Sequence, residues 1–205
     1  TVNNVAIENS SNTISDALEN ITLNLNDVTT GNQTLTITQD TSKAQTAIKD
    51  WVNAYNSLID TFSSLTKYTA VDAGADSQSS SNGALLGDST LRTIQTQLKS
   101  MLSNTVSSSN YKTLAQIGIT TDPSDGKLEL DADKLTAALK KDASGVGALI
   151  VGDGKKTGIT TTIGSNLTSW LSTTGIIKAA TDGVSKTLNK LTKDYNAASD
   201  RIDAQ

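Results

Sequence analysis

Two stretches of this chain carry the same heptad spacing of apolar residues, and this spacing limits the available folds more than any other feature. Steps of three and four residues keep one stripe on one face of a helix, which is typical of helices that pack side by side. We assign the helix-packing seam to Ile48, Trp51, Tyr55, Leu58 and Phe62 in the first stretch and to Val184, Leu188, Leu191, Tyr195 and Ile202 in the second.

The two stretches are predicted to pair with each other. Residues 41–67 would form a helix roughly 40 Å long at about 1.5 Å per residue. The second stretch, residues 184–202, repeats the spacing and is the natural antiparallel partner in a bundle. A heptad also serves oligomerisation, and the spacing alone does not separate the two uses. We favour pairing within the chain.

Residues 1–40 are predicted to be β structure. Apolar and polar residues alternate strictly over 21–26 and again over 34–38, which indicates two strands. The polar residues 27–33 between them suit a hairpin loop. Residues 13–19 are expected to form a short capped helix instead. Three strands including one near the start of the chain need more sheet or a partner to be stable.

A domain border is expected at Asp40, where the strand pattern ends and the heptad pattern begins. The predicted domains are residues 1–40, as the incomplete end of a β-rich domain, and residues 41–205, as a helical domain. The chain starts abruptly at Thr1 and stops within a pattern at Gln205, so we expect it to be a fragment.

The middle of the chain is predicted to contain a polar mobile loop, two helices and a hairpin. Residues 69–83 are small and polar and have too few apolar side chains to offset their ordering entropy. A helix is expected over 85–106, capped by Asp88 or Ser89. A β-hairpin is expected at 116–131, because residues 122–126, DPSDG, supply a turn. A helix should follow it, from 131 to 140.

Two further helices are expected before the C-terminal stretch. A short piece is predicted around residues 146–151, and residues 159–172 have apolar side chains on one side. The expected fold class is therefore α+β: an elongated antiparallel helical bundle or coiled coil with a small β-hairpin, preceded by part of a β-rich domain.

Composition excludes several classes of chemistry. The 205 residues include no histidine and no cysteine, which removes the commonest general base, thiol nucleophiles, disulfides and any Ser-His-Asp triad. A net charge of -4 offers no basic field for nucleic acid, and no apolar run is long enough for a membrane span. A carboxylate-dependent hydrolase is an alternative, but no acid lies in an apolar or aromatic setting. We assign no catalytic residue and no cofactor.

Two motif-like segments are interpreted as turns. Residues 122–133, DPSDGKLELDAD, lack the carboxylate spacing and terminal glutamate of a calcium loop, so no metal site is assigned. Residues 152–157, GDGKKT, share only composition with a phosphate-binding loop, because the required glycine-to-lysine spacing fails.

Three longer motifs resemble one protein family. They are VNNVAIENSSNTISDALENITLNL from residue 2, ALLGDSTLRTIQTQL from residue 84 and LAQIGITTDPSDGKLELDADKLTAAL from residue 114. In this order they are similar to the C-terminal half of FliD, the bacterial flagellar filament cap family (hook-associated protein 2). The resemblance covers essentially the whole chain, and that family offers no catalytic residue to transfer.

The resemblance implies a structural role. Such a protein is extracellular, at the distal tip of the flagellum, and is exported without a cleaved signal peptide. Its full-length form would assemble with itself into a ring, contact flagellin and the filament tip, and promote flagellin polymerisation without monomer leakage. By analogy, residues 1–40 would end a β-rich head domain, and residues 41–205 would form most of a helical leg. A surface adhesin that recognises host glycans is the alternative function.

Overall fold

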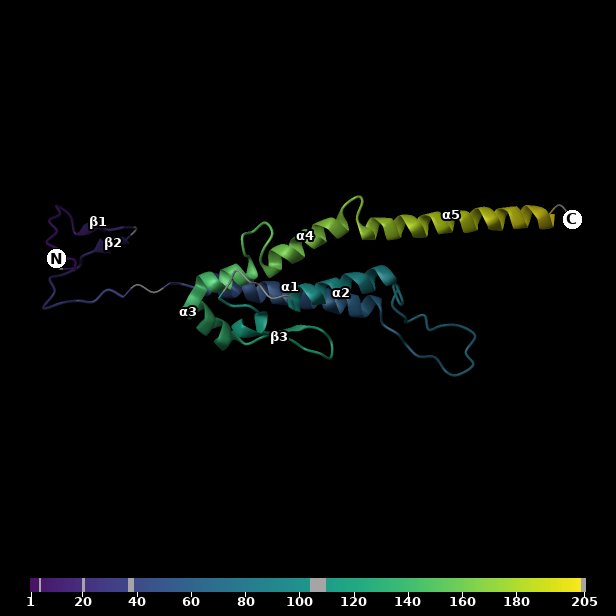
Figure 1. The fold of residues 1–205 in the computed structure, drawn as a ribbon, viewed down its shortest axis with the longest axis horizontal. Coiled ribbons are helices and arrows are strands. Elements are labelled where there is room, and N and C mark those ends of the chain that lie inside the picture. The colour runs from purple at the N-terminus through teal and green to yellow at the C-terminus, as the bar shows by residue number, and fades with distance from the viewer. Residues whose placement is uncertain (4, 20, 37–38, 104–109, 204–205) are drawn as a thin grey trace. The chain divides into compact units, whose positions relative to one another are not determined.

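The structure, a computed structural model, describes residues 1–3, 5–19, 21–36, 39–103 and 110–203 (Figure 1). The chain divides into two compact units, Thr1–Gln39 and Asp40–Gln205. The first contains a two-stranded antiparallel sheet, and the second combines α-helices with another two-stranded antiparallel sheet. The predicted α+β class is confirmed.

Unit 1 is built on one irregular hairpin. Strand β1 (Thr13–Leu18) pairs antiparallel with β2 (Ile21–Asn24), and the register shifts between Ile14 and Leu18. Ile14 is buried, whereas Val28 is 90% exposed. A single hairpin with so little buried apolar surface is at best marginally stable in water.

Three predictions for unit 1 are wrong. Residues 13–18 form a strand rather than a helix, because their β-branched Thr13 and Ile14 pair across to β2 and cross-strand pairing outweighs a local capping signal. Residues 21–24 are therefore the second strand of the observed hairpin, and residues 27–33 do not form the predicted hairpin loop. Residues 34–36 form no strand, and the rest of that predicted strand, residues 37–38, lies outside the described residues.

Helix α1 (Ser42–Leu65) forms one side of the core of unit 2. Its buried residues are Ile48, Val52, Tyr55, Ile59 and Phe62. The predicted stripe is thus rotated by one residue at two positions, where Val52 and Ile59 replace Trp51 and Leu58. Those two side chains are only partly buried, along the border of the same face. An apolar face wider than a two-position seam accounts for the difference.

The chain returns from α1 to α2 through a loop that closes tightly at its base. The Gly83 N–H donates to the Lys67 carbonyl at 2.7 Å, and the Leu85 N–H donates to the Leu65 carbonyl at 2.9 Å. A Cβ on Gly83 would lie 2.2 Å from the Leu65 carbonyl oxygen, so this close approach requires glycine.

Helix α2 (Ser89–Ser103) begins four residues after the predicted start. The Asp88 carboxylate accepts the Leu91 N–H at 2.7 Å, which confirms Asp88 as a capping residue. The predicted end at residue 106 lies outside the described residues.

The predicted hairpin is confirmed. Strand β3 (Ile119–Thr121) pairs antiparallel with β4 (Leu128–Leu130), with Thr120 opposite Glu129. Gly126 in the turn has φ = +81°, a conformation that glycine adopts at little cost. The strand starts later than expected, because Leu114–Ile117 form the 3-10 helix η1.

Helix α3 (Ala132–Ile150) joins two predicted helices across a kink at Asp142, whose φ and ψ are -157° and 81°. The Asp131 carboxylate accepts the Lys134 N–H at 3.0 Å and caps the start of α3. The Asp142 carboxylate accepts the Gly145 N–H at 2.8 Å and so begins the second half. Helix α4 (Ile159–Leu171) confirms the next predicted helix.

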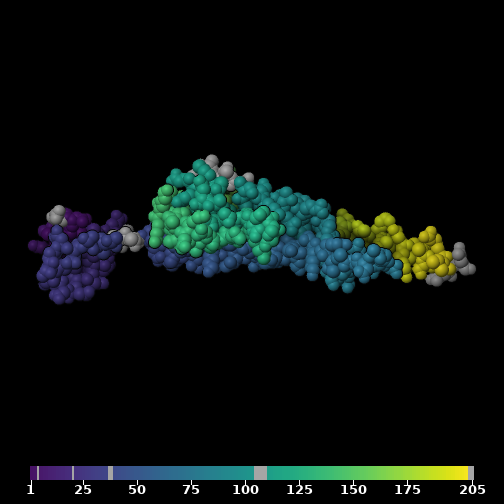
Figure 2. Space-filling model, turned by 90° about the horizontal axis from the view of Figure 1, so that it is seen from below, coloured from purple at the N-terminus to yellow at the C-terminus, as the bar shows by residue number. Residues whose placement is uncertain are grey.

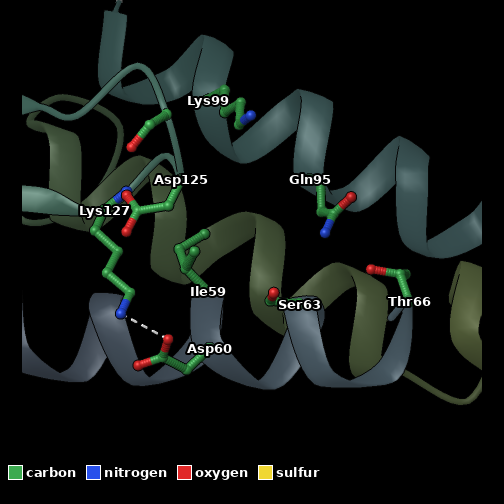
Figure 3. Close-up of a pocket in the computed structure, with 9 residues that line it drawn as sticks. Ile59, Asp60, Ser63, Thr66, Gln95, Lys99, Asp125 and Lys127 are labelled. Carbon is green, nitrogen blue, oxygen red and sulfur yellow. Dashed lines mark hydrogen bonds and ion pairs between the residues drawn. The ribbon is translucent and has the colours of Figure 1, made fainter. Parts of the chain in front are cut away.

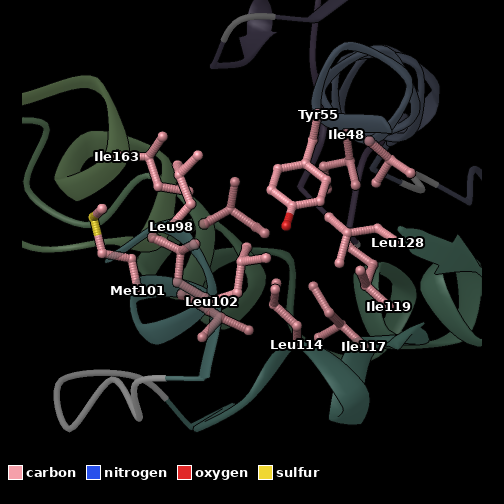
Figure 4. Close-up of a cluster of buried hydrophobic side chains, with 14 of the residues drawn as sticks. Ile48, Tyr55, Leu98, Met101, Leu102, Leu114, Ile117, Ile119, Leu128 and Ile163 are labelled. Atoms are coloured by element: carbon pink, nitrogen blue, oxygen red, sulfur yellow. The ribbon is translucent and has the colours of Figure 1, made fainter. Parts of the chain in front are cut away.

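The core of unit 2 lies where α1, α2, η1, the hairpin, α3 and α4 meet. Figure 4 shows Tyr55 of α1, Leu98 and Met101 of α2, and Ile163 of α4 directed into one cluster with the residues of η1 and the hairpin. In the space-filling view, residues 111–150, in teal and green, lie against α1, in blue (Figure 2). Leu98, Ile117 and Leu149 are fully buried.

Candidate functional site: the exposed face of the C-terminal helix

Helix α5 (Ile176–Asp203) is formed from residues that support a helix locally. Lys178 pairs with Asp182 and Lys190 with Asp194, both at 2.5 Å and one helical turn apart. The Thr192 hydroxyl donates to the Leu188 carbonyl four residues earlier at 3.0 Å. Exposed pairs of this kind contribute little to stability, so the helix depends on what its apolar face contacts.

That apolar face is exposed. The five predicted seam residues have exposed fractions between 61% and 73%: Val184, Leu188, Leu191, Tyr195 and Ile202. Every residue from Gly183 to Ala197 is exposed. The heptad stripe is thus present on α5 as the sequence predicts, but this chain leaves it uncovered.

The predicted pairing of α5 with α1 within the chain is wrong. Helix α5 packs against α4 and α2 instead, and it extends past the end of α2 (Figure 1). The stripe of α1 is already occupied, since Ile48, Tyr55 and Phe62 lie in the core with α2 and the hairpin. The burial of the α1 seam therefore owes nothing to the α5 seam.

An uncovered stripe of this length favours association. Within proteins, helices gain most of their stability from tertiary packing of an apolar face. Covering a Val, Leu or Ile side chain fully contributes about 1.5–3 kcal/mol. Contiguous exposed apolar residues rimmed by polar ones mark interaction surfaces. We therefore take the exposed face of α5 as the candidate functional site.

The sequence analysis did not predict that two α1 side chains, Asn56 and Tyr55, form hydrogen bonds to the hairpin. The Asn56 amide donates to the Leu128 carbonyl at 2.8 Å and accepts the Leu128 N–H at 2.7 Å, so it pairs with the edge of β4 as a neighbouring strand would. The Tyr55 hydroxyl donates to the Gly126 carbonyl at 3.4 Å, and burial raises the pKa of Tyr55. A polar residue beside an apolar stripe is the only signal that could have indicated Asn56.

A polar groove lies between α1, α2 and the hairpin turn, with a volume of about 420 Å³ (Figure 3). Its walls are Ile59, Asp60, Ser63 and Thr66 of α1, Gln95 and Lys99 of α2, and Ser124, Asp125 and Lys127 of the hairpin. The Lys127 ammonium bonds the Asp60 carboxylate at 2.7 Å, and this bond raises the pKa of Lys127. No aromatic side chain is among these residues, so the groove has no platform for stacking a sugar ring.

In residues 152–157, the segment that resembles a phosphate loop, the backbone N–H groups bind an aspartate of the same segment. The Asp153 carboxylate accepts the N–H groups of Lys155, Lys156 and Thr157 at 2.7–2.9 Å, and these bonds hold the pKa of Asp153 well below its usual range. The amides that would cradle a phosphate are already paired.

The calcium-like segment is likewise used internally. Asp122 and Asp125 accept backbone N–H groups of the turn, and Asp131 caps α3. Among the described residues, no group of three or more acids is placed to hold a metal ion. In that same part of the chain, no helix has the length and apolar character to cross a membrane.

Comparison with known proteins assigns the family. The family model described as "Flagellar hook-associated protein 2 C-terminus" matches residues 1–205. The chain belongs to this family. Flagellar hook-associated protein 2 of Salmonella typhimurium is 53% identical over 98% of this chain and 43% of its own length. The Xenorhabdus nematophila protein of the same name is 36% identical over 100% of this chain and 45% of its length.

A solved structure of the hook-associated protein 2 family has a related fold. The crystal structure of the flagellar cap protein FliD D1-D2-D3 domains from Escherichia coli is 92% identical, with a TM-score of 0.67 over 89% of this chain and 48% of that one. The sequence resemblance is therefore confirmed. The chain spans less than half the length of these relatives.

Proposed function

We propose that this chain is part of a filament cap of the bacterial flagellum. In this proposal the protein sits extracellularly at the distal filament tip, as a ring-shaped oligomer of itself, and promotes flagellin polymerisation while preventing monomer leakage. Its role is structural and not catalytic, with no nucleic-acid partner and no membrane insertion. Family membership and the name of the crystallised relative, a flagellar cap protein, support this assignment.

The observation that carries the proposal is the uncovered heptad stripe of α5. Its five residues are exposed along the helix, while the equivalent stripe of α1 lies in a core. A helix that presents an ordered apolar face without a partner in its own chain is suited to assembly. We infer that Val184, Leu188, Leu191, Tyr195 and Ile202 pack against another helix of the assembled protein.

The two units then correspond to parts of two domains. Residues 1–40 would belong to a β-rich head domain, which accounts for a lone hairpin with exposed Val28 and Leu35. Residues 41–205 would form most of the leg, where a core of helices supports the free face of α5. Export without a cleaved signal peptide completes the proposal, by analogy with the family.

A deletion strain tests the cap function. Cells that lack the gene should release unpolymerised flagellin into the medium and build few or short filaments, measured by immunoblotting and electron microscopy. Complementation with Leu188→Ser and Leu191→Ser should restore less assembly than wild type. The matched control, Asn189→Ser with Lys193→Ser, changes polar residues of the same helix and should restore it fully. Normal filaments in the deletion strain would exclude the cap function.

A further inference from the structure

The base of the loop between α1 and α2 contains Asn82 and Gly83, the only asparagine–glycine pair in the sequence. An asparagine side chain loses ammonia when the backbone nitrogen of the next residue attacks its amide carbon. Glycine favours this attack, because it has no Cβ to hinder the approach and adopts many backbone conformations. The sequence of this chain therefore favours deamidation at Asn82.

The folded chain holds the attacking nitrogen in place. The Gly83 N–H donates to the Lys67 carbonyl at 2.7 Å, and the Leu85 N–H beside it donates to the Leu65 carbonyl at 2.9 Å. The Gly83 backbone also has little room to rotate, since a Cβ there would lie 2.2 Å from the Leu65 carbonyl oxygen. The Gly83 nitrogen therefore cannot turn toward the Asn82 side chain while the base of the loop is closed.

The Asn82 side chain, which carries the carbon under attack, is held as well. Its Oδ1 accepts the Thr69 N–H at 2.7 Å, and its Nδ2 donates to the Gln78 side-chain carbonyl at 3.1 Å. Ring closure requires the two reacting atoms to approach in line to about 3–3.5 Å. The hydrogen bonds of both Asn82 and Gly83 must therefore break before the reaction can start.

We propose that Asn82 is a site of spontaneous deamidation that reacts only when the base of the loop opens. In the open loop the Gly83 nitrogen loses its proton to water and attacks the Asn82 Cγ. The new C–N bond closes a succinimide ring, the Cγ–Nδ2 bond breaks, and Nδ2 takes a proton from water and leaves as ammonia. A water molecule then opens the ring at one of its two carbonyls, which gives aspartate or isoaspartate at position 82.

Either product weakens the base of the loop. An aspartate at position 82 is ionised at neutral pH, so it accepts the Thr69 N–H but has no hydrogen to donate to Gln78. An isoaspartate adds a carbon to the main chain next to Gly83, whose close approach to Leu65 leaves no space for it. Closure is less favourable after the reaction, so the modified loop is open for a larger fraction of the time.

Peptide mass spectrometry tests whether the fold controls the reaction. The intact chain is incubated at mildly alkaline pH, either folded in buffer or unfolded in guanidinium chloride, and the modified fraction of Asn82 is followed over days. We expect the folded chain to react at least about 10-fold more slowly, because only molecules with an open loop base can react. Equal rates in the two states would overturn control by the loop base. An Asn82 that stays unmodified in the unfolded chain would overturn the site itself.

The variant Gln78→Ala tests the hydrogen bonds of the Asn82 side chain. It removes the acceptor of Nδ2, so it should raise the rate in the folded chain about 3-fold and leave the rate in the unfolded chain unchanged. The matched control is Gln97→Ala, an exposed position on α2, which should react as wild type does. Circular dichroism verifies that both variants fold. Equal folded-state rates for the two variants would reject the protective role of the side-chain bonds.

Limited proteolysis tests the consequence for the loop. After incubation, subtilisin should cut wild-type protein within residues 69–83 faster than it cuts a fresh sample, since cleavage follows the population of the open loop. Asn82→Gln is the control, compared with its own fresh sample, because its longer side chain would have to close a larger ring and reacts far more slowly. Incubated wild-type protein that is cut no faster than fresh protein would overturn the proposed opening of the loop.

Discussion

Helices α1 and α5 carry the same heptad spacing, yet the stripe of one is buried and that of the other is exposed. Phe62 of α1 lies in the core at 8% exposure, whereas Tyr195 of α5 is 71% exposed. The difference lies in what surrounds each helix: α1 is covered by α2 and the hairpin, whereas α5 packs against α4 and α2 and leaves its apolar face exposed. The heptad spacing therefore predicts that a helix has a packing face, but the partner of that face depends on the elements around the helix.

The largest expected effect is the loss of stability on removing the buried ring of Phe62, compared with removing the exposed ring of Tyr195. Phe62→Ala should lower the free energy of unfolding by about 3–5 kcal/mol, because it removes a buried ring and leaves a cavity. Tyr195→Ala should change it by less than about 0.5 kcal/mol, as for an exposed site. Urea denaturation of the 205-residue chain measures both. Equal losses would show that the α5 stripe is covered within the chain after all.

The rotation of the α1 stripe gives a finer comparison between adjacent residues. Ile59 is buried and Leu58 only partly so. Ile59→Ala should cost about 2–5 kcal/mol, and Leu58→Ala clearly less, because its side chain loses fewer contacts. Unfolding in urea ranks the two variants. A larger loss for Leu58→Ala would restore the stripe that the sequence predicts.

The sequence predicts the helices of unit 2 better than their contacts. The spacing in residues 41–67 and 184–202 locates α1 and α5, and the segment DPSDG locates the β3–β4 turn, because these signals are local. Pairing of α1 with α5 is a long-range choice among several apolar faces, and periodicity carries no information on it. For the same reason, the spacing predicts which residues form the apolar stripe of α5 but not which surface covers it.

The short strands of unit 1 are hard to predict from the sequence because they, too, depend on contacts with residues elsewhere in the chain. Thr13 can cap a helix or start a strand, and only the partner across the hairpin, Asn24, decides between them. Asn56 posed a similar problem in unit 2, since its two bonds join residues separated by 72 positions. Candidate site residues whose role depends on such distant contacts cannot be recognised from local pattern.

The Asn56 side chain of α1 holds the hairpin by two hydrogen bonds to Leu128. Asn56→Ala should lower the free energy of unfolding by about 1–3 kcal/mol, because the Leu128 N–H and carbonyl would lose their partners in a buried setting. Asn53→Ala, an exposed position one turn earlier on α1, is the control and should stay within about 0.5 kcal/mol. Thermal unfolding followed by circular dichroism suffices. A neutral Asn56→Ala would mean that water or another group replaces the amide.

The smallest effect is the pH dependence of the ion pair between the hairpin and α1. The hydrogen bond with Asp60 raises the pKa of Lys127 above its ordinary value of 10.5. The ion pair therefore contributes fully to stability at pH values below 10.5, and this contribution is lost as the pH rises through the pKa of Lys127 in the folded state. Lys127→Met should therefore be slightly less stable than wild type at pH 7, with the difference vanishing at strongly alkaline pH. Because both groups are substantially exposed, high salt should also reduce the difference at pH 7. Thermal melts of both proteins across pH 7–12 measure this difference. Lys186→Met on α5 controls for the loss of one charge, because Lys186 is exposed and forms no ion pair among the described residues. A difference that grows with pH would contradict the assignment of this pair as a stabilising contact.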